Sequence, residues 1–125
     1  MLATYASIVG AELPVDAGPD SFDFSPVLLG QQPTGKPIRE SLVIRSGGGA
    51  MTIRSREWKL ITALGSGGFS KPRRLKPEPG GSKGQLYNLA DDLGETNNLY
   101  QKCPDIVQRL TAELSRIHHA EWSRN

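Results

Sequence analysis

Cysteine is almost absent from this sequence, since Cys103 is the only one among 125 residues. A single cysteine excludes an internal disulfide and gives no firm indication of compartment. No apolar run reaches the length of about 18 residues that a membrane-spanning helix needs. The first residues also lack the basic start and the long apolar stretch of a signal peptide. We therefore expect no membrane among the partners of this chain.

A strong excess of one charge is also missing. The net charge is +2, which by itself favours no particular partner. The charge is unevenly distributed, because residues 65–83 carry five basic side chains against the single acidic side chain of Glu78. The basic ones are Lys71, Arg73, Arg74, Lys76 and Lys83. This patch is local, unlike the broad basic footprint of a nucleic-acid-binding domain, so we predict no nucleic acid partner.

The chain does have the length and apolar content of one folded domain. Apolar residues make up 37% of it. Its 14 glycines bring the total into the ordinary range of about 45–50% for globular domains, a range that counts glycine. We predict a modest core with one or more open loops.

Residues 1–41 have the pattern of a helix end followed by an irregular linker. Apolar residues at positions 2, 5, 6 and 9 have helical spacing, and Gly10 suits a helix stop. Closely spaced Pro and Gly punctuate the rest of this segment. Within it, Ser25 as N-cap and Pro26 at the first helical position predict a single helical turn.

Four β-prone runs follow, over residues 42–45, 51–55, 58–64 and 85–89. The glycine turn at 47–49 predicts an antiparallel hairpin of the first two runs. Arg56 and Glu57 predict a tight connection into the third run. Alternation along that run places Trp58 in the core and Lys59 toward solvent.

Two further segments complete the chain. Residues 65–84 are rich in Gly, Ser, Pro and basic side chains, and predict a long basic surface loop. Pro104 suits the start of a helix over roughly residues 104–122. Its apolar stripe consists of Ile106, Val107, Leu110, Leu114 and Ile117.

Four motifs, in order along almost the whole chain, resemble the C-terminal end of sulfatases. The family patterns are "AG-x-x-LP", "DG-x-D-[LF]-S-P-x-L-x-G", "VR-x-x-x-WKLI" and "LYDL-x-x-D-P-x-E-x-x-NL". The matching segments here are Ala11–Pro14, Asp20–Gly30, Ile53–Ile61 and Leu86–Leu99. The departures are small: Ser21 stands where the family often has Gly, Asn88 replaces Asp, and Leu93 replaces Pro.

The resemblance implies an α+β fold. We expect a small antiparallel sheet of about four strands, a C-terminal helix packed on it, and a short N-terminal helix. Residues 1–41 would link this part to a catalytic domain, and residues 42–125 would form the sulfatase C-terminal subdomain. The partner would be the missing N-terminal catalytic domain of the same chain. The substrate of the parent enzyme would be a sulfated small molecule or sugar.

The chemistry implied for the parent enzyme is hydrolysis of sulfate esters. In the family, the N-terminal domain holds calcium and a Cys or Ser in a C/S-x-P-x-R motif that is oxidised to formylglycine. Cys103 fails this motif because Asp105 stands where Pro is needed, two residues on, and Val107 stands where Arg is needed, four residues on. We therefore predict no catalytic residue, metal site or cofactor in these 125 residues, and no activity for the fragment alone.

The basic loop is the best candidate for a binding role. A flexible basic segment could screen the charge of an anionic substrate and raise its rate of encounter. The substrate-binding candidates are Phe69, Lys71, Arg73 and Arg74. Phe69 would stack on an apolar or ring surface, and the basic residues would face the sulfated group.

Other interpretations of the same residues are weaker. The glycine-rich stretch 65–71 lacks the Gly before Lys that a Walker A loop needs. His118 and His119 are adjacent, so one helix points them in different directions rather than toward one metal ion. Two rival functions stay open: a stand-alone module that binds anionic polysaccharide, and the tail of a related phosphodiesterase or phosphonate hydrolase.

Overall fold

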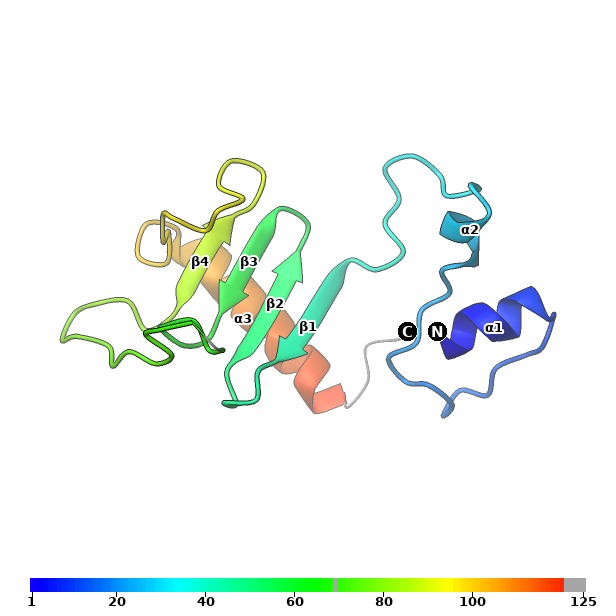
Figure 1. Cartoon of the computed structure of the whole chain (residues 1–125), viewed down its shortest axis with the longest axis horizontal. Helices are drawn as coiled ribbons and strands as arrows, with labels where there is room; N and C mark the ends of the chain where they lie inside the picture. The colour runs from blue at the N-terminus through cyan, green and yellow to red at the C-terminus, as the bar shows by residue number, and fades with distance from the viewer. Residues whose placement is uncertain (69, 121–125) are drawn as a thin grey trace. The chain divides into compact units, whose positions relative to one another are not determined.

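The computed structural model describes residues 1–68 and 70–120. These divide into two compact units, one of residues 1–40 together with the chain from Arg116, and one of residues 41–115. Figure 1 shows the helices and strands of each unit. The arrangement is α+β, as the sequence predicted.

The larger unit is built on a four-stranded antiparallel sheet. Its strands are β1 (Ser41–Arg45), β2 (Met51–Ser55), β3 (Trp58–Ile61) and β4 (Gln85–Asn88). They lie side by side in sequence order, so each strand pairs with the next. β3 ends earlier than the predicted run to residue 64, because the chain leaves the ladder after Thr62 to enter the basic loop.

The register of the sheet places three buried side chains opposite one another. Ile53 of β2 lies opposite Leu60 of β3, and Leu60 lies opposite Leu86 of β4. Cross-strand partners share a face, so these three side chains form one row. Each is at most 1% exposed.

Helix α3 (Pro104–Ala120) covers that face of the sheet (Figure 1). Leu110 and Leu114 of its apolar stripe are buried, which is the packing that the helical spacing predicted. Asp105 stands in the first turn, where a negative charge is favourable to the helix dipole.

The opposite face of the sheet carries an ion pair. Lys59 Nζ lies 2.5 Å from Glu95 Oε1, and the two side chains are only 26% and 32% exposed. Lys59 is thus half-buried and paired, not simply solvent-facing as its place in the alternation suggested. Beside it, burial raises the pKa of the Tyr87 hydroxyl, and the charges of Glu95 and Asp92 add to that effect.

The smaller unit ties two short helices together through hydroxyl groups. Helix α1 (Leu2–Ile8) buries Thr4, whose Oγ1 accepts the Phe24 N–H at 3.0 Å. The Ala3 N–H donates to Ser21 Oγ at 2.8 Å in the first turn of α1. Ser7 Oγ lies 3.1 Å from Ser25 Oγ, at the start of helix α2 (Ser25–Leu28). Four hydroxyl-bearing side chains therefore fix α1 against the 21–25 segment.

The capping of α2 differs from the prediction. Ser25 is the first residue of the helix and not its N-cap, which is Phe24. The Asp23 carboxylate accepts both the N–H and the Oγ–H of Ser25, at 2.8 and 2.9 Å. These bonds lower the pKa of Asp23. The Ser25 hydroxyl therefore donates to Asp23, whose charged acceptor makes strong hydrogen bonds at this end of α2.

The polar turn after β4 is organised by Asp92. Its carboxylate accepts the Thr96 N–H at 3.0 Å and the Asn97 N–H at 2.8 Å. These backbone hydrogen bonds, the one from Thr96 first, lower the pKa of Asp92 below its ordinary value of 3.8. The turn also holds Glu95 at a φ of 55°, a conformation that a non-glycine residue adopts only when its surroundings impose it.

The stability of the larger unit is expected to depend on the ionisation of Asp92. Because its folded-state pKa is lowered, the carboxylate stabilises the fold above the ordinary pKa of 3.8, and this contribution disappears as the pH falls through the lowered value. Thermal unfolding should show Asp92→Ala less stable than wild type at about pH 6, and closer to wild type at about pH 2.5, which lies below the ordinary pKa of 3.8. Asp16→Ala, an exposed carboxylate in the smaller unit, serves as the control. An equal loss for Asp92→Ala at both pH values would contradict this account.

Candidate functional site

The basic loop is folded back on itself between residues 64 and 75. Leu64 and Leu75 form an antiparallel bridge, closed by the Leu75 N–H on the Leu64 carbonyl at 3.2 Å. The Ser66 N–H donates to the Pro72 carbonyl and the Gly67 N–H to the Arg73 carbonyl, both at 3.0 Å. We call residues 64–68 and 70–75 together the 64–75 hairpin. The sequence suggested only an open, flexible loop, because its small and polar residues show no β periodicity.

The first residue of β4 anchors this hairpin to the sheet. Gln85 Nε2 donates to the carbonyls of Ala63 and Gly65, each at 2.9 Å. The other end of the same amide, Oε1, accepts the hydroxyl proton of Tyr87 at 2.7 Å. Since Tyr87 is buried, its hydroxyl fixes which way the Gln85 amide points and so holds the base of the hairpin.

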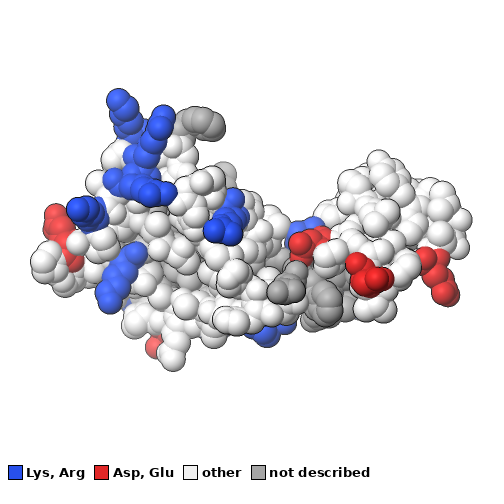
Figure 2. Space-filling view, turned by 90° about the horizontal axis from the view of Figure 1, so that it is seen from below, with Lys and Arg blue, Asp and Glu red and all other residues white. Residues whose placement is uncertain are grey.

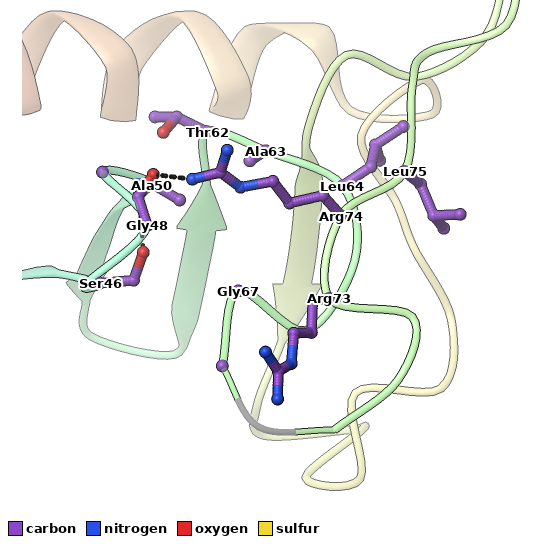
Figure 3. Close-up of a pocket in the computed structure, with 12 residues that line it drawn as sticks. Ser46, Gly48, Ala50, Thr62, Ala63, Leu64, Gly67, Arg73, Arg74 and Leu75 are labelled. Atoms are coloured by element: carbon purple, nitrogen blue, oxygen red, sulfur yellow. Dashed lines mark hydrogen bonds between the residues drawn. The ribbon is translucent and has the colours of Figure 1, made fainter.

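A hollow of about 510 Å³ lies between the 64–75 hairpin, the end of β3 and the β1–β2 turn (Figure 3). It draws its walls from three separate stretches of the chain. The residues that line it are Ser46, Gly48, Gly49, Ala50, Thr62, Ala63, Leu64, Gly67, Gly68, Arg73, Arg74 and Leu75. Of these described residues two are basic and none is acidic, so their net charge is positive.

The two neighbouring arginines of the hollow do different things. The Arg74 guanidinium reaches across and donates to the Gly48 carbonyl in the β1–β2 turn. Figure 3 shows this bond, and shows Arg73 extending separately beside Gly67. Among residues 1–68 and 70–120, no hydrogen bond or ion pair engages the Arg73 guanidinium. The Arg74 guanidinium therefore makes a hydrogen bond within the fold, whereas the Arg73 guanidinium is available to bind a ligand.

The other predicted binding residues fall outside the hollow. Lys71 is exposed on the hairpin and does not line it. Phe69 lies outside the described residues. Lys and Arg side chains gather on this side of the larger unit, at the left of Figure 2. The sequence prediction missed Ser46, Thr62 and the glycines that line the hollow, because most of them lie far from Arg73 and Arg74 in the sequence.

One match to the formylglycine motif escaped the prediction, which considered only Cys103. Ser70-Lys71-Pro72-Arg73-Arg74 has the C/S-x-P-x-R spacing. The stretch lies on the exposed hairpin, where the Ser70 carbonyl accepts the Ser66 hydroxyl at 2.5 Å. In the part of the chain that the structure describes, no three His, Cys, Asp or Glu side chains are grouped to hold a metal ion. The residues present do not fit the calcium site that the motif serves, so we assign Ser70 no catalytic role.

Comparison with known proteins agrees with the motif resemblance, although no family model matches the chain. The N-acetylgalactosamine-6-O-sulfatase of Bacteroides thetaiotaomicron is 29% identical over 118 residues, which cover 94% of this chain and 22% of that enzyme. A solved sulfatase chain, connected with the metabolism of multiple glycosaminoglycans by the same organism, matches with a TM-score of 0.72 and 29% identity. That match covers 94% of this chain and 24% of the solved one.

The chain thus has the sequence pattern and the fold of a sulfatase C-terminal subdomain. It spans less than a quarter of the length of each of these two relatives. In the described residues, no helix is long and apolar enough to cross a membrane.

Gly65 is expected to be essential for the hairpin geometry. Its φ is +93°, and a Cβ there would lie 2.9 Å from the backbone of Pro72 and Arg73. Gly65→Ala should therefore destabilise the protein by about 2 kcal/mol or more in urea unfolding, because backbone atoms must shift. Gly80→Ala is the matched control. Its φ is +76°, with nothing within 4 Å of the added Cβ, so its loss should be only about 1 kcal/mol. Equal losses would show that the close approach at Gly65 does not constrain the hairpin.

Proposed function

We propose that this chain is the C-terminal subdomain of an enzyme that hydrolyses sulfate esters. The observation that carries the proposal is the likeness to sulfatases along 94% of the chain, in sequence and in fold alike. The formylglycine nucleophile and the calcium ion of such an enzyme would be held by the catalytic domain. The subdomain alone would be inactive.

The smaller unit supports a role as a structural cap on the catalytic domain. Its helices and their ends expose many large apolar side chains, each 48–74% accessible. They are Leu2, Tyr5, Ile8 and Val9 on the α1 side, and Val27, Leu28 and Leu29 on the α2 side. Fully burying one such side chain is worth roughly 1.5–3 kcal/mol. A contiguous catalytic domain that covered this surface would therefore be stabilised by it.

The same relatives support a proposal for the substrate class. One is an N-acetylgalactosamine-6-O-sulfatase, and the other is connected with glycosaminoglycan metabolism. We propose a sulfated sugar as substrate, with 6-sulfated N-acetylgalactosamine as the first compound to test. The basic 64–75 hairpin would lie toward the part of the substrate that extends from the scissile sulfate, where positive charge assists the approach of a polyanion.

Sulfate release provides the direct test. The full-length protein that carries this subdomain should release sulfate from N-acetylgalactosamine 6-sulfate, whereas the 125-residue chain alone should release none above the buffer rate. The phosphate diester and phosphonate analogues are the controls for the rival hydrolases. Faster turnover of either analogue by the full-length protein would contradict the sulfatase proposal, and sulfate release by the 125-residue chain would contradict its inactivity.

A further inference from the structure

We propose that the hollow between the β1–β2 turn and the 64–75 hairpin binds a second sulfated sugar unit of a polymeric substrate. Arg73 contacts its sulfate group, and Arg74 is a positioning residue that holds the two walls of the hollow together. This inference rests on the proposed function, because it takes the ligand class from the sulfatase assignment. It adds a separate subsite, built wholly from residues of the larger unit.

The positive charge of the side chains that line the hollow favours an anionic ligand. Among the residues that the structure describes, its lining includes two guanidinium groups and no carboxylate. The Arg73 side chain stands on an exposed part of the hairpin and has no partner among the described residues. An arginine can give a sulfate two parallel N–H···O bonds, which are stronger than neutral hydrogen bonds. Nothing in the lining competes with the ligand for Arg73.

The size and the walls of the hollow fit more than a bare ion. Its volume of about 510 Å³ lies within the range of roughly 300–1,000 Å³ of small-molecule sites. Leu64 and Leu75 supply apolar surface, and Leu75 is 53% exposed. Gly48 and Gly67 leave room for close approach to the backbone. A sugar ring with one sulfate group matches this mixture of apolar surface and a single charged contact.

The bond from Arg74 explains how two separate segments can form one site. The β1–β2 turn and the hairpin are separate excursions of the chain, and the Arg74 guanidinium joins them at the Gly48 carbonyl. A Cβ on Gly48 would lie 2.8 Å from Arg74 Nη2, so the guanidinium sits directly against the turn. Because this bond holds the two walls together before a ligand binds, it reduces the entropic cost of ordering them on binding.

Kinetics of the full-length protein on two substrates separate this subsite from the catalytic centre. The substrates are N-acetylgalactosamine 6-sulfate and a chondroitin 6-sulfate hexasaccharide, compared at one ionic strength. Arg73→Gln should raise KM for the hexasaccharide by about 10-fold, the loss expected for one charge-assisted hydrogen bond. It should raise the KM for the monosaccharide less than that for the hexasaccharide, because the monosaccharide carries no second sulfate group.

Lys76→Gln is the matched control for Arg73→Gln. It removes the same charge from the same basic segment, but Lys76 is exposed and does not line the hollow. Its KM for the hexasaccharide should change by less than about two-fold. Equal effects of Arg73→Gln and Lys76→Gln would overturn the subsite in favour of a diffuse attraction for polyanions. Equal wild-type kcat/KM for the two substrates would overturn it as well.

The positioning role of Arg74 is tested by comparing the KM values of two Arg74 variants. Arg74→Gln should raise KM for the hexasaccharide alone, and Arg74→Lys should restore most of the affinity because an ammonium group can still donate to Gly48. A merely structural role would instead lower the melting temperature and the turnover of both substrates together.

Direct binding separates failure of this inference from failure of the proposed function. If the full-length protein hydrolyses neither sulfate ester, the sulfatase proposal fails. Titration calorimetry with the hexasaccharide then still decides the subsite. Weaker binding by Arg73→Gln than by Lys76→Gln supports it. Equal binding by the two variants, or binding of a DNA oligonucleotide of equal charge with the same affinity, overturns it.

Discussion

The packing of the larger unit depends on one row of buried side chains. The row consists of Ile53 on β2, Leu60 on β3 and Leu86 on β4. The antiparallel register places the three side chains opposite one another, and α3 closes over them with Leu110 and Leu114. The hollow and the turn organised by Asp92 both lie at ends of these strands. The β1–β2 turn and the 64–75 hairpin leave one end of the sheet, and the turn organised by Asp92 follows β4. The buried row therefore fixes the distance between segments that have little packing of their own.

The elements could be predicted because their patterns are local. Alternation revealed the strands, the 3.6-residue stripe revealed α3, and the order of the motifs revealed the family resemblance. The site could not be predicted in the same way. Arg73 and Arg74 are equivalent in the sequence, and only the position of Gly48 in space distinguishes them. Lys59 and Glu95 are 36 positions apart, and no periodicity links them.

The departures from the family motifs have structural explanations at two of three positions. Ser21 accepts the Ala3 N–H at the start of α1, where the N-cap residue Met1 makes no side-chain cap bond. Asn88 keeps the acceptor of an Asp by receiving the Ala90 N–H, and its amide also donates to Asp91. Leu93, which stands in place of Pro, is 82% exposed, and nothing in the structure explains its choice. Ser21 thus adds a hydrogen bond that Gly could not make, and Asn88 keeps one that Asp could make.

The central claim is that these residues work as one part of a larger hydrolase, and the size of the native protein tests it most directly. An antibody raised against residues 41–115 would identify the protein in an extract of its source cells, and mass spectrometry of the intact protein would then give its mass. The account predicts a mass roughly four to five times the 13.6 kDa of this chain, as its share of the relatives requires, with a C/S-x-P-x-R motif in the preceding sequence. A native mass of 13.6 kDa would contradict it.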